Sequence, residues 1–127
     1  MADHTIVNLR EVEDAAKKFG MPPGLESRFA RSALGLRKSG VTLFTMGPDY
    51  KLPWGHRHRD QEEVYLVVRG SATVGFEDGS SAELREWDAV RIPADVARSM
   101  KAGPDGPELL AFGAGEHGDA EMIQDFW

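Results

Sequence analysis

The chain contains no cysteine among its 127 residues. This excludes disulfides, thiol catalysis and thiolate metal ligands, so any bound metal must be held by nitrogen and oxygen. Basic residues are also scarce, because 15 Lys and Arg stand against 21 Asp and Glu and give a net charge of −6. A nucleic-acid partner would favour a basic surface, so this charge argues against one.

Long apolar runs are missing as well. No segment approaches the length needed to cross a membrane, so a membrane partner is not expected. The first residues, 1–6, lack the basic and apolar regions of a signal peptide, which makes a cytoplasmic location the expectation. The P-loop, nucleophile-elbow and zinc-finger spacings are absent too, which removes those classes of site.

What the sequence does contain is a series of short β-type segments. A single domain is expected from 127 residues, of which 41% are hydrophobic. Residues 8–19 are predicted to form a helix with Asn8 as its N-cap, and Asp78-Gly79 predicts a hairpin turn. Evenly spaced strands indicate an all-β sandwich or barrel. The predicted strands are residues 41–46, 63–68, 71–77, 80–86, 89–92, 98–102 and 108–112.

A cluster of metal-binding residue types lies ahead of the most apolar strand. His56 and His58 are two positions apart, so on a strand both imidazoles leave the same face. Glu63 follows five residues after His58 and begins the apolar segment, with Tyr65 on the same face as Glu63. Two imidazoles and a carboxylate are a suitable ligand set for a divalent transition metal.

This arrangement resembles the first motif of the cupin superfamily: a glycine, five residues, H-x-H, three or four residues, E, six residues, G. His56, His58, Glu63 and Gly70 match it, whereas Tyr50 replaces the leading glycine. The resemblance covers roughly residues 40–113. It implies a cupin-type jelly-roll barrel there. Outside it, residues 1–39 are expected to form the helix and an extended arm, and residues 114–127 a tail that includes Trp127 and whose apolar spacing predicts a short helical turn.

The second cupin motif is only partly present. Pro93 matches, but Trp87 and Asp95 replace glycines, and Arg98 stands where the family has its last histidine ligand. Two unit charges ~4 Å apart repel by ~4 kcal/mol at an effective dielectric of ~20, and a dication doubles this. Arg98 therefore either pairs with Glu63 in a metal-free pocket or moves aside and leaves a 2-His-1-carboxylate site. His4 and His117 are further candidates for completing the site.

Two functions follow from these alternatives. One is a metal-dependent enzyme of the oxygenase or isomerase type, with His56, His58 and Glu63 as ligands and Arg98 orienting a small anionic substrate. Iron, manganese, nickel, zinc and copper are not distinguished. The other is a metal-free small-molecule binding or sensor module that contains a Glu63–Arg98 pair. The resemblance also implies a homodimer, the commonest closed oligomer.

Overall fold

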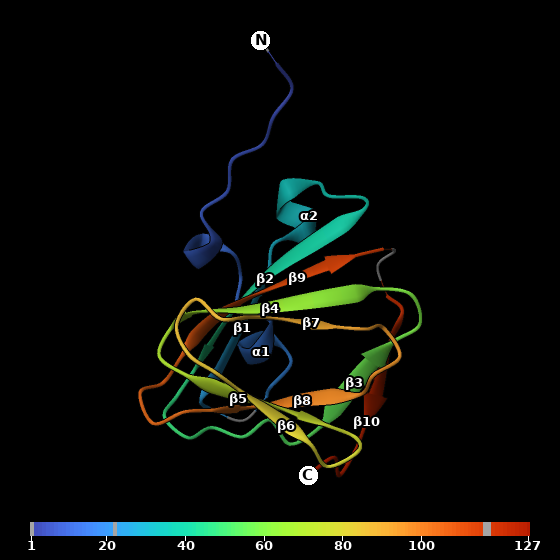
Figure 1. Ribbon diagram of the computed structural model, residues 1–127. Coiled ribbons are helices and arrows are strands. Elements are labelled where there is room, and N and C mark those ends of the chain that lie inside the picture. The colour runs from blue at the N-terminus through green and yellow to red at the C-terminus, as the bar shows by residue number, and fades with distance from the viewer. Residues whose placement is uncertain (1, 22, 116–117) are drawn as a thin grey trace.

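The chain forms a sandwich of two five-stranded sheets, seen as two layers in Figure 1. The computed structural model describes residues 2–21, 23–115 and 118–127. Sheet A has the order β1-β2-β9-β4-β7 and sheet B the order β10-β3-β8-β5-β6. Every strand pair within the described ranges is antiparallel. The prediction of an all-β sandwich is confirmed. The strands are β1 (Leu25–Phe29), β2 (Ser39–Met46), β3 (Gly55–His58), β4 (Glu62–Arg69), β5 (Ala72–Phe76), β6 (Ser81–Leu84), β7 (Ala89–Ile92), β8 (Arg98–Ala102), β9 (Glu108–Ala114) and β10 (Ala120–Ile123).

Sheet A directs alternate side chains of β4 into the space between the layers. Glu63, Tyr65 and Val67 face inward, because side chains alternate along a strand. Tyr65 is opposite Ala111 on β9 and Val90 on β7, so a row of inward-facing residues crosses the sheet. Along β4, the inward-facing side chains are fully buried toward the end of the strand, where Val67 is 0% exposed. Glu63 lies at the other end, which places its carboxylate at the edge of the core.

Sheet B supplies the opposite wall. β3 pairs with β8 so that His56 lies opposite Arg98, and it pairs with β10 on its other side. Gly55 begins β3 at a close contact, because a Cβ at this position would overlap the Phe126 ring. The ring of Phe126 therefore packs directly on the backbone just before the two histidines.

The N-terminal segment differs from the predicted single helix. Asn8 does cap a helix, a short 3-10 turn η1 (Leu9–Glu11), but the chain is extended again at Val12. A separate helix α1 (Ala15–Lys18) then begins at Asp14, whose side chain accepts hydrogen bonds from the backbone N–H groups of Ala16 and Ser27. The side chain of Asp14 thus starts a new helix and ties it to β1, which interrupts the predicted one.

Three elements outside residues 40–113 were not predicted. β1 and helix α2 (Arg31–Leu34) form from residues expected to be an extended arm. The predicted helical turn near Trp127 is wrong, because residues 120–123 form β10. Ahead of η1, residues 3–7 run away from the sandwich (Figure 1). Among the described helices, none is long and apolar enough to span a membrane.

Candidate metal centre

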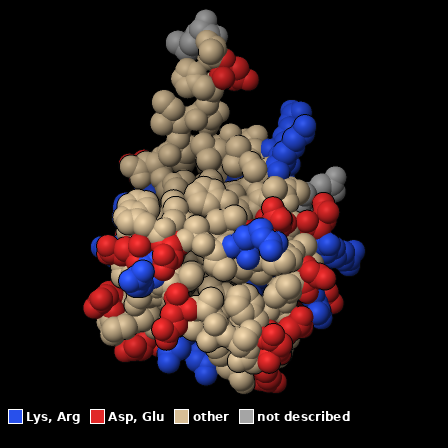
Figure 2. Space-filling model, in the orientation of Figure 1, with Lys and Arg blue, Asp and Glu red and all other residues tan. Residues whose placement is uncertain are grey.

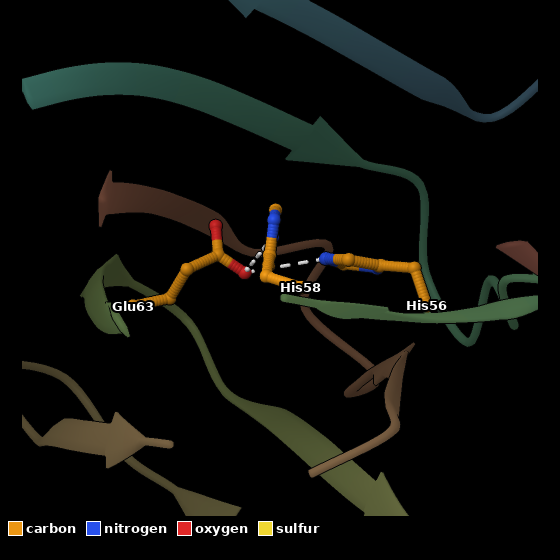
Figure 3. A group of neighbouring side chains, drawn as sticks. All are labelled: His56, His58 and Glu63. Carbon is orange, nitrogen blue, oxygen red and sulfur yellow. Dashed lines mark hydrogen bonds and ion pairs between the residues drawn. The ribbon is translucent and has the colours of Figure 1, made fainter. Parts of the chain in front are cut away.

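Three side chains converge at one end of the sandwich. His56 and His58 project from the same face of β3, and Glu63 reaches them from β4 in the facing sheet (Figure 3). Glu63 Oε1 lies 3.2 Å from His56 Nε2 and 3.0 Å from His58 Nε2. The three ligand atoms lie within 4.8 Å of one another. The sequence spacing predicted that these three residues share a site, and the fold places their ligand atoms close together.

The orientation of His58 is set by Asp119, a residue that the sequence analysis missed. His58 Nδ1 lies 2.8 Å from Asp119 Oδ1, while Asp119 Oδ2 accepts hydrogen bonds of 2.8 Å from the backbone N–H groups of Asp60 and Gln61. An ionised carboxylate can only accept, so Nδ1 of His58 carries the proton. In neutral His58 the lone pair is then on Nε2, which faces Glu63. Carboxylate–histidine pairs of this kind orient metal-bound imidazoles in proteins.

His58 Nε2 is buried and has no hydrogen-bond partner among the described residues. It is nevertheless 3.0 Å from Glu63 Oε1. A lone pair and a carboxylate oxygen at this distance repel unless a cation lies between them. Either a proton on Nε2, which makes His58 an imidazolium paired with Glu63, or a metal ion can hold the two atoms together.

The spacing of the ligand atoms also fits a metal. Nitrogen and oxygen ligands bind a divalent ion such as zinc at ~2.0–2.2 Å, and two such ligands at a right angle are ~3 Å apart. The observed nitrogen-to-oxygen distances are 3.0 and 3.2 Å. The residues present therefore suit an ion that retains open coordination positions.

Arg98 lies beside Glu63 and is completely buried, at 0% exposure. Its Nη2 donates a hydrogen bond of 2.8 Å to the carbonyl of Pro93, and its Nη1 is 3.4 Å from Glu63 Oε1. Nη1 and Nε have no hydrogen-bond partner within the described part of the chain. The guanidinium therefore contacts the carboxylate, as the metal-free alternative expects, while both histidines also contact it.

Tyr65 contributes a hydroxyl to the same oxygen. Its side chain is buried, and its hydroxyl donates a long hydrogen bond of 3.4 Å to Glu63 Oε1. Burial, reinforced by the nearby Glu63 charge, holds the pKa of Tyr65 well above its usual value. Tyr65 is therefore a hydroxyl donor near the pocket, as the alternation along β4 suggested.

The charges of the cluster stabilise one another. Burial works to raise the pKa of Glu63, but the hydrogen bonds and charges of His56 and His58 outweigh it and bring that pKa to about 2. Burial works to lower the pKa of His58, but its contacts with Glu63 and Asp119 raise it overall. Burial would raise the pKa of Asp119, yet the N–H groups of Asp60 and Gln61 and the contact with His58 hold it well below its usual range. Both carboxylates are ionised at neutral pH and can act as ligand and orienting group.

Of the further sequence candidates, His4 does not join the cluster. His4 lies in the exposed N-terminal arm, where its ring contacts the carbonyl of Ala2. His117 lies outside the described residues. Asp119 gave no signal in the sequence, because only the pairing of β10 with β3 brings it to His58.

A cavity of about 440 Å³ opens from the cluster into the space between the sheets. This volume is typical of small-molecule sites, which range over ~300–1,000 Å³. His56, His58, Glu63 and Tyr65 line it, whereas Arg98 is not part of the lining. The cluster is therefore accessible to a ligand from one side and screened by Arg98 on the other.

Comparison with known proteins shows the fold. No family model matches the sequence, and no curated protein is similar enough to count as a relative. Among solved structures, a cupin protein from Bacteroides fragilis has a TM-score of 0.70 at 21% identity, covering 95% of this chain and 91% of that one. A sugar phosphate isomerase of the cupin superfamily from Silicibacter pomeroyi has a TM-score of 0.70 at 17% identity, covering 94% and 92%.

Oxalate decarboxylase from Bacillus subtilis is similar over part of its length. One of its structures has a TM-score of 0.73 at 18% identity and covers 98% of this chain. The chain spans 33% of the length of that enzyme. This chain thus covers most of the length of the first two structures and a third of the length of the decarboxylase.

Proposed function

We propose that this chain, which has the cupin fold, is a metal-dependent enzyme of the oxygenase or isomerase type that acts on a small molecule. His56, His58 and Glu63 are the metal ligands. The observation that carries the proposal is the buried Nε2 of His58, which faces a carboxylate oxygen at 3.0 Å and lacks a hydrogen-bond partner among the described residues. A divalent ion satisfies both atoms at once.

The bound ion would supply a positive charge that polarises an oxygen atom of the substrate. The protein groups have separate tasks. Asp119 holds the proton on Nδ1 of His58 and so keeps Nε2 available. Tyr65 and Arg98 contact Glu63 from the protein side and fix the direction of its carboxylate. Because Arg98 is fully buried, it acts on Glu63 rather than orienting the substrate itself.

A metal-free binding module remains the second candidate. The contact between Arg98 Nη1 and Glu63 Oε1, at 3.4 Å, favours it, because a guanidinium already balances the carboxylate charge. In this case the cavity binds a small molecule and no reaction is catalysed. Two of the similar structures are named as enzymes of small molecules, an oxalate decarboxylase and a sugar phosphate isomerase, which supports the enzyme over the module.

Elemental analysis of protein purified without an affinity tag or chelator tests the proposal and identifies the metal. We expect one transition metal per chain in the natural protein. The His58→Ala variant should lose it while keeping its fold, because the core is built from other residues. His4→Ala is the matched control, since His4 is exposed in the arm, and it should keep its metal.

Two results would contradict the proposal. Metal-free natural protein that also fails to take up iron, manganese, nickel, zinc or copper on dialysis would favour the binding module. Full metal content in a variant with both His56 and His58 changed to Ala would place the ion elsewhere.

A further inference from the structure

We propose that the substrate is an aromatic molecule with one compact oxygen group, neutral or singly charged, and not a sugar phosphate or a dicarboxylate. This inference names the substrate class of the proposed metal site and rests on that proposed function. It is based on the composition and charge of the 440 Å³ cavity. The polar cluster lies at one place in its wall, and Ser27, Arg31, Thr42 and Gln61 are further polar lining residues. Apolar side chains from the end of α1, both sheets and the loop before β3 form most of the rest: Phe19, Phe29, Phe44, Leu52, Trp54 and Met100.

The aromatic side chains favour a flat, apolar ligand body. Phe29 and Phe44 already pack edge to face, with ring centroids 6.3 Å apart. Both line the cavity, as does Trp54 just ahead of β3. A ligand ring placed among them would gain both apolar burial and the preferred aromatic geometries. Among the described lining residues, the neutral polar side chains outside the cluster are Ser27, Thr42 and Gln61. A polyol would therefore leave most of its hydroxyl groups without partners against these rings, which is costly.

The guanidinium groups near the cavity already have hydrogen-bond or ion-pair partners within the protein. Arg31 is the single Lys or Arg in the lining among the described residues, and its guanidinium donates to the carbonyls of Gly115 and Arg37. Arg98 is hidden behind Glu63 at 0% exposure. A phosphate or a second carboxylate would therefore enter an apolar space without a free partner, whereas one oxygen group can bind at the histidine cluster.

The position of the histidine cluster at the inner end of the cavity sets the orientation of the ligand. Phe19 and Phe29 are 74% and 54% exposed, so they mark the solvent side of the cavity. His58 is 8% exposed and lies at the inner end. The oxygen group is thus expected to enter first and reach the cluster, with the ring held between Phe29, Phe44 and Trp54.

Calorimetric titration with three probes tests the inference: oxalate, glucose 6-phosphate and 1-hydroxy-2-acetonaphthone, whose adjacent hydroxyl and ketone form one compact oxygen group. Each is added to metal-free and to metal-loaded protein. We expect the aromatic hydroxyketone to bind at least ~10-fold more tightly than either anion in both forms, a difference of about 1.4 kcal/mol. Tighter binding of oxalate or glucose 6-phosphate to the metal-loaded protein would overturn the inference.

A cavity-filling variant locates the binding. Ala111 faces inward opposite Tyr65 and lines the cavity, so Ala111→Leu should weaken hydroxyketone binding by at least ~10-fold. Ala89→Leu is the matched control, because Ala89 lies opposite Leu66 on the outer face of sheet A. If Ala111→Leu does not fold, Phe29→Ser at the exposed mouth replaces it and should weaken binding severalfold. Unchanged affinity in the variant that folds would overturn the inference.

The outcomes separate this inference from the proposed function. If the chain takes up no metal but metal-free protein binds the hydroxyketone in a way that depends on Ala111, the ligand class stands and the enzyme proposal fails. If metal binds at His56 and His58 but the anions are preferred, the metal site stands and the ligand class fails.

Discussion

Arg98 brings a permanent positive charge to within 3.4 Å of the carboxylate oxygen proposed as a metal ligand. At ~4 Å and an effective dielectric of ~20, such a charge repels a dication by ~8 kcal/mol, which Glu63 and Asp119 must offset. Arg98→His removes this charge and adds a neutral imidazole, the side chain most often found on metals. We expect divalent affinity to rise at least ~10-fold, or about 1.4 kcal/mol, by calorimetric titration.

Arg91→His is the matched control for this change. Arg91 lies opposite Val64 on the outer face of sheet A, away from the cluster, so its replacement should leave metal affinity unchanged. Weak binding that does not improve in the Arg98 variant would show that the guanidinium is not what limits the ion.

Asp119 is expected to act on the metal through His58. Asp119→Asn keeps the shape of the side chain but removes the charge that orients the imidazole. Changes of this kind typically lower metal affinity by ~10–100-fold. Competition with a chromophoric chelator measures the loss. Glu121 is an exposed carboxylate two residues further on, in β10, and pairs with Arg57. The Glu121→Gln variant should bind the metal as tightly as the natural protein. Equal affinity in the two variants would remove Asp119 from the site.

At the level of single residues, the sequence predicted the local part of the site. His56, His58, Glu63 and Tyr65 lie within ten positions, so alternation along strands was enough to place them on shared faces. Asp119 could not be predicted, because its contact with His58 joins residues 61 positions apart and depends on which strands become neighbours. Sequence spacing carries no information on that pairing.

At the level of elements, strands were predicted correctly where apolar and polar residues alternate and where turn residues border the segment. The hairpin of β5 and β6 forms around Asp78-Gly79, with Gly79 at a φ of 86°. The single N-terminal helix was wrong because the Asp14 side chain bonds Ser27 on β1, a tertiary contact that no helical pattern contains. β10 was missed for a similar reason, since its strand conformation depends on pairing with β3.

The N-terminal turn η1 is joined to sheet A by an ion pair with a testable pH dependence. Arg10 makes two hydrogen bonds, of 2.6 and 2.8 Å, to the buried Glu108 carboxylate. The Arg10 hydrogen bond, opposed by burial, lowers the pKa of Glu108. A lowered carboxyl pKa stabilises the fold above the unfolded value of ~4.3, and this contribution is lost as pH falls through the folded pKa.

Glu108→Gln should therefore destabilise the protein at pH 7, by less than about 1 kcal/mol because solvent screens the exposed Arg10 guanidinium. The difference from the natural protein should shrink as pH falls below ~4. Urea unfolding at pH 7 and pH 3 measures it. Glu77→Gln, on an exposed pair with Arg57, is the control and should have little effect. A difference that stays constant with pH would show that the carboxylate charge does not stabilise the fold.

At the level of the whole molecule, the outer face of sheet A is largely apolar. Val64, Leu66, Leu110 and Phe112 point outward from β4 and β9, and Phe112 is 41% exposed. Figure 2 shows a largely uncharged area over β2, β9 and β4, with acidic and basic side chains around it. Apolar surface arranged in this way is typical of protein interfaces, and a second copy of the chain is the occupant that the expected homodimer requires.

Phe112→Glu should therefore convert a dimer into a monomer, because it places a charge at the centre of the contact. Light scattering on a sizing column across micromolar concentrations gives the mass. Met122→Glu adds the same charge at an exposed position on sheet B and should leave the dimer intact. Natural protein that is monomeric throughout, or a Phe112 variant that stays dimeric, would contradict this interface.

The contact between Asp119 and His58 also determines when, during synthesis, the proposed metal site can be completed. β3 is made long before β10, and a ribosome adding ~5–20 residues per second needs about 3–12 s to synthesise the 61 positions between the two side chains. During that interval the imidazoles are present but His58 lacks the group that orients it. If the proposed ion binds there, its tight uptake would wait until β10 has joined sheet B, so that metal content would report completed folding as well as ligand identity.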